Sequence, residues 1–413
     1  MPSQVSPSIL VNKVNWQKLG AYSFRRVDQI LDRVANIPNR GTTATLAQAK
    51  VPGLDQLAVT LPDNSTPTVR HIIDGTDTDG WMVLHHDKVV IEEYPGKNPY
   101  PDEYPGQMPD GTRHLLMSVT KSLTATVAGI LEDQGVIDTT RPVTGYSTWL
   151  QGSGYDGATV RQVLDMRSAI KFSEEYLDPK SEVAQMEAAA GWAPPLTWSG
   201  APDNTRDFLS GLQKDPNRNH GGPFEYRSCE SAVIGCVCED ATGKRFEELA
   251  SDLLWSKLGV ESDAYITVDK NGTGAFDGGI CATLRDLARF GAMICKGGES
   301  LSGQRVVSQT WVDDVFVGGS DSEDAFKKSP KYRDMRMPDG KYRSMFWSPT
   351  ANRDVVLCIG VYGQMVYINR ATQTVGVKLS GRNQPVALND LGGTWGNGFP
   401  AFLMFDKISA RLG

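Results

Sequence analysis

Residues 118–121 read Ser-Val-Thr-Lys and stand at the start of a predicted helix that extends to Gln134. The apolar residues of this segment recur at helical spacing, and Gly135 follows them as a stop signal. Residues three apart lie on one face of a helix, so the amine of Lys121 can reach the hydroxyl of Ser118. A helix N-terminus also offers unpaired N–H groups and a positive potential. This stretch therefore predicts a serine nucleophile with a lysine base.

The chemistry of this pair depends on the surroundings of the lysine. A serine hydroxyl is a weak nucleophile until a base removes its proton. A lysine amine, with a reference pKa of about 10.4, serves as that base only when burial or a neighbouring cation lowers its pKa. The alternative is a serine that caps a helix beside a surface lysine. A second match, Ser168-Ala-Ile-Lys171, is interpreted as a coincidence because the helical spacing ends there.

Two further motifs carry candidate residues. Tyr226 lies in Phe-Glu-Tyr-Arg-Ser, after a Gly-Gly-Pro loop and before a predicted helix. Its hydroxyl can relay a proton if a nearby ammonium lowers its pKa. Gly360 lies on a predicted strand, where the missing side chain lets a substrate approach, and the next N–H, that of Val361, can donate to an oxyanion. Taken singly, the tyrosine is also typical of packing and the glycine of a core strand.

Strand and helix patterns divide the chain into three parts. Two β-rich runs around a polar turn predict a hairpin over residues 81–94. Helical spacing dominates between about residues 140 and 270, with predicted helices over 160–166, 205–212, 231–241 and 245–258. The other predicted elements are helices over 22–35, 283–294 and 309–316, strands over 354–361, 364–368 and 374–379, and a final helix after Pro400.

A hairpin early in the chain and strands late in it are typical of one antiparallel sheet built from both chain ends. We therefore predict an α+β fold with two domains. The first comprises residues 1–140 and 275–413 and contains the antiparallel sheet flanked by helices. The second, residues 141–274, is a mainly helical domain inserted into the first. The active site is expected at their interface.

Composition argues against several function classes. The formal net charge is −7, from 42 Lys and Arg against 49 Asp and Glu, so no nucleic-acid partner is expected. No segment has the ~20 apolar residues of a membrane span, and the first residues lack a signal-peptide pattern. The six cysteines match no zinc or redox spacing, which favours free thiols and a cytoplasmic location. Neither a metal nor an organic cofactor is indicated by the histidine and glycine patterns.

Together, the Ser-x-x-Lys, Tyr-x-Ser and strand-glycine motifs resemble those of the class C β-lactamase and penicillin-recognising serine hydrolase superfamily. Within it, the chain is most similar to 6-aminohexanoate-dimer hydrolases and related carboxylesterases. The similarity extends from about residue 81 to 380, and its most specific segments are 113–122, 163–166, 176–179, 181–183, 264–269 and 377–380. The resemblance implies a β-lactamase-like fold with Ser118 as nucleophile and Lys121 with Tyr226 as the proton-transfer pair. It also implies an oxyanion hole formed by the N–H groups of Ser118 and Val361.

The resemblance implies substrate-binding positions as well. Tyr176 matches a tyrosine that lines the pocket and contacts the scissile amide in the nylon-oligomer enzyme, and Gly360 and Tyr362 belong to the strand end beside the site. Glu187 and Asp277 fall where that enzyme has polar or acidic substrate-contacting residues, and together they could hold a protonated amine. Alternatively, they are solvated surface carboxylates.

The chain departs from the β-lactamase pattern at two places. Where β-lactamases carry Lys-Thr-Gly on the strand, residues 358–360 read Cys-Ile-Gly, so the lysine that would meet a β-lactam carboxylate is missing. The tyrosine motif reads Tyr-Arg-Ser instead of Tyr-Ala-Asn, which removes an amide that would contact a penicillin-type acyl group. Efficient β-lactam hydrolysis is therefore not expected.

We expect a serine hydrolase that cleaves small linear amides or short-chain esters through an acyl-enzyme. Alternatives are a carboxylesterase without amidase activity and a D-amino-acid amidase or peptidase. A penicillin-type sensor without turnover is favoured least, because no membrane tether or output domain is visible. The expected partner is a small-molecule substrate. A homodimer is compatible with the sequence, which does not determine the oligomeric state.

Overall fold

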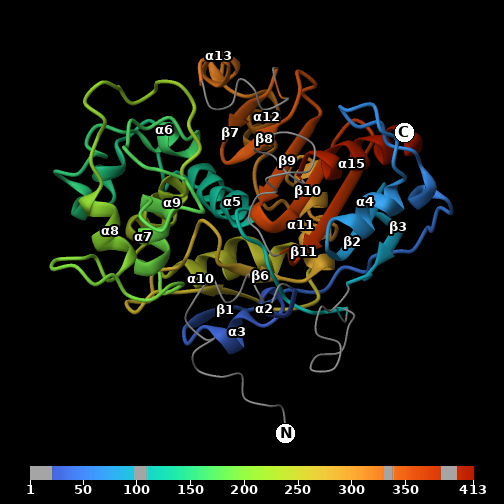
Figure 1. Ribbon diagram of the computed structural model, residues 1–413, viewed down its shortest axis with the longest axis horizontal. Helices are drawn as coiled ribbons and strands as arrows, with labels where there is room; N and C mark the ends of the chain where they lie inside the picture. Colours follow the sequence, from blue (N-terminus) through green and yellow to red (C-terminus); the bar gives the residue numbers. More distant parts are fainter. Residues whose placement is uncertain (1–20, 97–107, 109, 330–336, 338, 383–397) are drawn as a thin grey trace, which may run out of the picture.

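An antiparallel sheet of seven strands occupies the right half of the molecule in Figure 1. The computed structural model describes residues 21–96, 108, 110–329, 337, 339–382 and 398–413. In spatial order the strands are β3 (Lys88–Glu93), β2 (Thr78–His85), β11 (Thr374–Ser380), β10 (Gln364–Asn369), β9 (Val355–Gly360), β8 (Phe346–Ser348) and β7 (Lys341–Arg343). The early hairpin pairs with the late strand β11, from His85 opposite Thr374 onwards. The prediction of one antiparallel sheet built from both chain ends is thus confirmed.

Helices cover both faces of this sheet. α11 (Leu284–Cys295) approaches closely at Gly291, where an added Cβ would lie 2.6 Å from the side chain of Val375. On α15 (Gly398–Leu412) the ring of Phe405 lies against Gly376, the next residue of the same strand. Successive residues of a strand face opposite sides of its sheet. The two helices therefore pack on opposite faces of the sheet.

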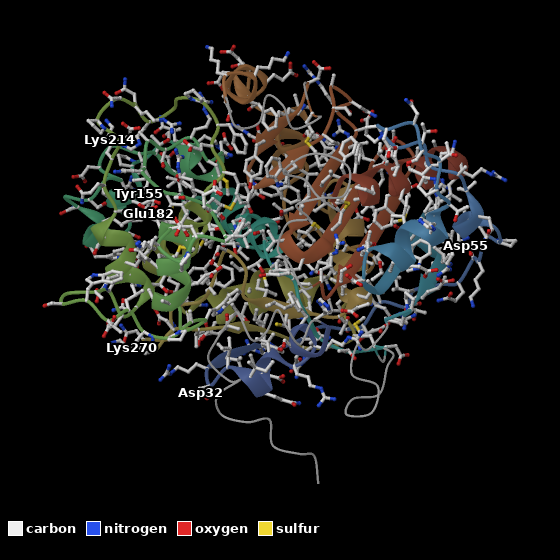
Figure 2. The ribbon with its side chains drawn as sticks, in the orientation of Figure 1. Asp32, Asp55, Tyr155, Glu182, Lys214 and Lys270 are labelled. Carbon is white, nitrogen blue, oxygen red and sulfur yellow. The ribbon has the colours of Figure 1, made fainter. Side chains whose placement is uncertain are left out.

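The helices α6 to α10, called the helical part below, lie on the left in Figure 1, with α5 (Val119–Asp133) between them and the sheet. Their bounds are α6 (Val160–Leu164), α7 (Glu182–Ala189), α8 (Thr205–Gly211), α9 (Ser228–Thr242) and α10 (Phe246–Leu249). Tyr155, labelled in Figure 2, is fully buried inside the helical part. Other described helices include α4 (Val69–Gly75), α12 (Gln309–Val317), α13 (Ser322–Lys327) and short 3-10 turns at Leu54–Gln56, Val143–Gly145 and Thr148–Leu150. The division into two domains stays a prediction.

Two predicted helices differ from the structure. The helix over 245–258 is instead α10 followed by a π-helical turn (Ala250–Leu254) and a 3-10 turn (Trp255–Lys257). The helix over 22–35 is two single turns, α2 (Ala21–Phe24) and α3 (Val27–Ile30), followed by strand β1 (Val34–Ile37). β1 pairs along its whole length with β5 (Ala264–Thr267), so long-range sheet pairing overrides the local helical pattern there.

A second, smaller sheet joins distant parts of the chain below α5. Its order is β1, β5, β6 (Ile280–Ala282) and β4 (His114–Leu115), all antiparallel. β4 ends three residues before Ser118, and the Leu116 N–H donates to the Ile280 carbonyl at 2.9 Å. This small sheet therefore determines where α5 begins.

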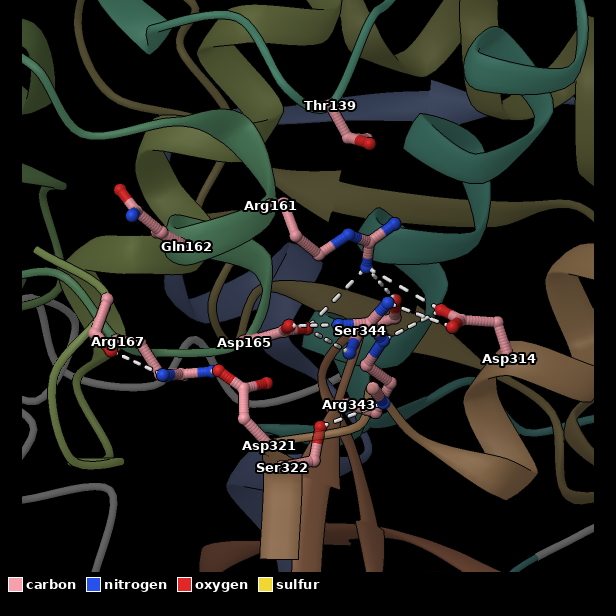
Figure 3. Close-up of polar contacts among 12 residues, drawn as sticks. Thr139, Arg161, Gln162, Asp165, Arg167, Asp314, Asp321, Ser322, Arg343 and Ser344 are labelled. Carbon is pink, nitrogen blue, oxygen red and sulfur yellow. Dashed lines mark hydrogen bonds and ion pairs between the residues drawn. The ribbon is translucent and has the colours of Figure 1, made fainter. Parts of the chain in front are cut away.

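An ion-pair network connects the helical part to the large sheet (Figure 3). Arg343, at the end of β7, donates to Asp165 after α6 at 2.6 Å and to both carboxylate oxygens of Asp314 on α12 at 2.7 and 2.8 Å. Arg161 donates to the hydroxyl of Ser344 at 2.7 Å. The bidentate contact fixes β7 relative to α12 more firmly than a single contact would, and the contact with Asp165 adds the end of α6 to this group.

Two features of the described residues concern disulfide bonds and membrane spans. All six cysteines are buried free thiols. Among the residues that the structure describes, none of the helices combines the length and the apolar character needed to cross a membrane.

Helix α5 carries the candidate nucleophile and is buried along almost its whole length, so close packing around it sets its position. A Cβ on Gly129 would lie 2.3 Å from the indole ring of Trp311, which is itself buried. Gly129→Ala should therefore reduce the free energy of unfolding by about 1–3 kcal/mol through overpacking, in urea unfolding followed by circular dichroism.

The matched control is Gly75→Ala at the end of α4, where an added Cβ meets no atom within 4 Å. We expect the stability of this variant to change by less than about 1 kcal/mol, in the stabilising direction. Equal stability of the two variants would show that the packing around α5 tolerates a shift.

Candidate active site

Ser118 and Lys121 meet in a buried position at the N-terminus of α5. The Lys121 Nζ donates to the Ser118 Oγ at 2.9 Å and to the backbone carbonyl of Asp277 at 2.8 Å. Lys121 is 1% exposed, so the alternative of a surface lysine beside a capping serine does not apply. Met117, just before the serine, has a positive φ of 48°, which a residue with a side chain adopts only at a cost. The backbone thus turns sharply to present the hydroxyl.

The surroundings of Lys121 meet the condition that the sequence sets for a lysine base. Burial lowers the pKa of Lys121 from its usual value. The carboxylates of Asp277, Glu174 and Glu187 act in the opposite direction, because nearby negative charges favour the ammonium. The loss of solvation is the larger effect. The amine is therefore closer to its neutral, basic form than an exposed lysine.

Tyr226 completes the group. Its phenol hydrogen-bonds with Ser118, and the Lys121 Nζ lies 5.2 Å from the centre of its ring. The pKa of Tyr226 is raised well above its usual value, first by loss of solvent and then by the charge of Glu174. The condition that the sequence reasoning set, a pKa lowered by a nearby ammonium, is therefore not met, because desolvation is the largest influence on this hydroxyl and raises its pKa. Tyr226 is a neutral phenol with a proton to donate.

The segment around Tyr226 is held by the helical part and by the large sheet. The Glu225 N–H donates to the Met166 carbonyl at 3.0 Å, and buried Arg227 donates to the Ser168 carbonyl at 3.1 Å. On the other side, the ring of Trp347 on β8 stacks on Tyr226 with centroids 5.4 Å apart. Tyr226 is therefore positioned by the two parts that the ion-pair network joins.

The second Ser-x-x-Lys match does not assemble a comparable pair. The Ser168 hydroxyl donates to the buried Glu230 carboxylate, and Lys171 is exposed. Burial raises the pKa of Glu230 to about 7. Ser168 thus serves the packing of the helical part, in line with its interpretation as a coincidence.

The end of β9 lies against the segment that leads to Ser118. A Cβ on Gly360 would lie 2.7 Å from the Leu116 carbonyl oxygen, so a side chain here would push the two segments apart. A 3-10 turn (Val361–Gly363) follows, in which Tyr362 has a φ of 66°. Tyr362 is 1% exposed and packs edge-on against Phe24 at 5.1 Å. The structure thus brings Gly360 and Val361 to the site, with the Tyr362 side chain turned into the core.

Glu174 is a site residue that the sequence reasoning missed. Its carboxylate accepts from the Tyr176 hydroxyl at 2.6 Å, the Ser228 hydroxyl at 2.5 Å and the Ser228 N–H at 2.8 Å. It therefore links the loop that carries Tyr176 to the motif that carries Tyr226. No spacing rule points to Glu174, since its partner Ser228 lies 54 residues away.

The two acidic candidates lie close enough to Lys121 for their charges to act on it. Burial is also the main cause that raises the pKa of Asp277, to about 6. Glu187, on α7, is half-buried. Among the described residues no group of His, Cys, Asp and Glu could hold a metal ion. The roles of Tyr176, Glu187, Asp277, Gly360 and Tyr362 in substrate binding stay predictions.

Comparisons with known proteins identify the family of the chain. The model of the family described as Beta-lactamase matches residues 68–393. The 6-aminohexanoate-dimer hydrolase of Paenarthrobacter ureafaciens is 39% identical over 376 residues, which cover 90% of this chain and 88% of that protein.

Solved structures share the fold at lower identity. One is a Bacillus anthracis protein provisionally assigned as a 6-aminohexanoate-dimer hydrolase, with a TM-score of 0.82, 23% identity and coverage of 100% of this chain and 98% of that one. Another is a family VIII carboxylesterase, with a TM-score of 0.60, 16% identity and coverage of 83% and 95%. The matched segments include all the motifs that meet at the N-terminus of α5. The chain belongs to the beta-lactamase family and is a serine hydrolase.

Proposed function

We propose that this hydrolase cleaves small linear amides and short-chain esters through an acyl-enzyme on Ser118. The observation that carries the proposal is the 2.9 Å contact between the Ser118 hydroxyl and a lysine amine that is 1% exposed. A neutral amine at this distance can take the hydroxyl proton directly, which is the step that a serine nucleophile requires.

The geometry supports the following sequence of steps. Lys121 takes the proton from Ser118 as its oxygen bonds to the substrate carbonyl carbon. The N–H groups of Ser118 and Val361 stabilise the resulting oxyanion. Tyr226 donates its proton to the leaving nitrogen or oxygen as the bond to carbon breaks, and Lys121 returns a proton to Tyr226. Water then loses a proton to the same pair, attacks the acyl carbon and releases the acid with Ser118 restored.

The charges around the site favour substrates with a free ammonium group. Asp277 and Glu187 both act on Lys121, so they lie within electrostatic range of the reacting groups. The relative that is 39% identical is named for a dimer of 6-aminohexanoate, a linear amide with a terminal amine. We infer that a linear ω-amino acyl amide is the preferred substrate class. A neutral short-chain ester is easier to cleave than an amide, because an alkoxide can leave without first being protonated.

Replacing the nucleophile tests the mechanism directly. Ser118→Ala should lower turnover of both a linear 6-aminohexanoate dimer and p-nitrophenyl butyrate by about 10³-fold or more, because the covalent step is lost. Product per enzyme is counted by mass spectrometry, which also separates multiple turnovers from a single acylation. Ser168→Ala, from the second Ser-x-x-Lys match, is the control and should retain activity. Activity retained by Ser118→Ala would exclude the proposed mechanism.

The protonation of Lys121 should appear in the pH dependence. Activity on a neutral ester should rise with pH as Lys121 loses its proton, below the pH range of an ordinary lysine, because burial lowers its pKa. The Asp277 carboxylate stabilises the ammonium, so Asp277→Asn should shift this rise to lower pH. The backbone carbonyl that holds the amine is unchanged in the variant. The logarithm of kcat/KM between pH 5 and 10 gives the midpoint, and a midpoint that stays or moves upward would contradict the assignment of Lys121 as base.

Comparing a cationic with a neutral substrate tests whether Glu187 attracts the substrate ammonium. Glu187→Gln should lower kcat/KM for the 6-aminohexanoate dimer by about 10-fold, equivalent to about 1.4 kcal/mol, because it removes a negative charge that attracts the substrate ammonium. Turnover of neutral p-nitrophenyl butyrate should change little. Glu248→Gln, an exposed charge change on α10, should affect neither substrate. Equal losses on both substrates would assign Glu187 to the structure of the site and not to amine recognition.

A further inference from the structure

Three buried polar side chains lie beneath the turn that carries Val361, and the mechanism above does not use them. They are Gln364 at the start of β10 and Lys378 and Ser380 on β11, none more than 1% exposed. We propose that Lys378, Ser380 and Gln364 form a clamp that positions the backbone N–H of Val361 for oxyanion stabilisation. This inference rests on the proposed function.

The turn needs support because its backbone is strained. Tyr362 and Gly363 both have positive φ angles, of 66° and 94°. A left-handed conformation is unfavourable for a residue with a Cβ and persists only where the surroundings hold it. Gly360 anchors the start of the turn against the Leu116 carbonyl. Its other end requires a separate anchor.

Gln364 supplies one half of that anchor. Its amide accepts from the Ser380 N–H at 3.0 Å and donates to the Ser380 carbonyl at 2.6 Å, so both ends of the side chain are fixed to β11. The same amide nitrogen lies 3.5 Å from the Val361 carbonyl oxygen. The peptide unit that follows Val361 is therefore tied to the sheet through a side chain of fixed orientation.

Lys378 supplies the other half. Its amine donates to the Gly363 carbonyl at 3.4 Å, to the Thr76 carbonyl at 3.4 Å and to the Ser380 hydroxyl. A Cβ on Gly363 would lie 3.4 Å from the same nitrogen and 3.1 Å from the Ser380 Cβ, so the turn rests directly on the clamp. An ammonium has three N–H donors, and three acceptors surround it here.

The hydrogen bond from the Lys378 amine to the Gly363 carbonyl can persist when the amine loses its charge. Burial, with a smaller effect of Arg382, lowers the pKa of Lys378 to about 7, and Asp79 and Asp77 act in the opposite direction. When the amine is neutral, its two N–H groups can still serve the carbonyls while its lone pair accepts from the Ser380 hydroxyl. The clamp therefore keeps its hydrogen bonds on both sides of neutral pH.

The energetic cost of this lysine points to a role other than stability. A buried amine loses its hydration, and an apolar side chain of similar length is generally accommodated at lower cost. Lys378→Met should therefore leave the protein as stable as the natural chain, or more so, while it weakens oxyanion stabilisation. Opposite changes of stability and activity are typical of residues that serve function.

The experiment compares Lys378→Met and Ser380→Ala with the natural chain and with Lys341→Met. Lys341 is a matched control, since it is a strand lysine that is 1% exposed, on β7, and burial lowers its pKa as well. Each protein is tested for kcat and KM on p-nitrophenyl butyrate, for inhibition by n-butylboronic acid and for thermal unfolding. The boronic acid forms a tetrahedral adduct on a reactive serine and so reports on the oxyanion hole.

We expect Lys378→Met to lower kcat by about 10- to 100-fold, with KM within about 2-fold, because the oxyanion exists only beyond the ground state. Its affinity for the boronic acid should fall in parallel. Ser380→Ala should show a smaller loss of the same kind, and Lys341→Met neither.

Natural kcat and natural boronic acid affinity in folded Lys378→Met would overturn the clamp. If Lys378→Met does not fold, full activity and affinity in Ser380→Ala would overturn it instead. Labelling of the natural chain with a fluorophosphonate probe separates failure of the clamp from failure of the proposed function. If the proposed function is wrong, the probe leaves Ser118 unlabelled, whereas failure of the clamp alone leaves Ser118 reactive.

Discussion

The buried amine of Lys121, held between the Ser118 hydroxyl and the Asp277 carbonyl, is the interaction on which the rest of the structure depends. Burying an amine costs free energy because the amine loses its hydration. Here the buried amine lies at the N-terminus of α5, a helix that is itself buried along almost its whole length. The contact joins the start of α5 to the loop before β6, and the candidate site also needs a third segment beside them, the turn before α9 that carries Tyr226. The small sheet places the first two, since β4 and β6 are paired neighbours. The ion pair of Arg343 on β7 with Asp165 ties the helical part, which carries the third segment, to the large sheet.

The elements that could be predicted from sequence are those with a strong local pattern. The helix after Ser118 and the strands over 354–379 lie within one or two residues of their predicted positions, because their apolar periodicity coincides with actual burial. The small sheet could not be predicted, since its strands have only two to four residues and gain their stability from partners far away in sequence. The same pairing converted part of the predicted helix over 22–35 into β1.

In the candidate site too, the residues that belong to a local motif could be predicted and those that depend on long-range contacts could not. The spacing within Ser-x-x-Lys and the order of the motifs brought Ser118, Lys121 and Tyr226 to attention without a structure. The link from Glu174 to Ser228, and those from Lys378 to Gly363 and Thr76, join residues 15 to 302 positions apart, which no motif encodes. The direction of the pKa shift of Tyr226 could not be inferred from the sequence for a related reason. A motif can suggest a charged neighbour, whereas desolvation, the main cause of the raised pKa, depends on how the whole site closes around the ring.

The opposing influences on Lys121 have a consequence for the proposed catalysis. Burial lowers its pKa, while Asp277, Glu174 and Glu187 raise it. A substrate ammonium bound beside Asp277 and Glu187 would offset their charges and add a positive charge near the amine. Both effects disfavour the protonated lysine, so arrival of a cationic substrate would convert Lys121 into a stronger acceptor for the Ser118 proton. If Asp277 and Glu187 bind the substrate as proposed, the same two groups would also control the base, and a neutral ester would be cleaved without that activation.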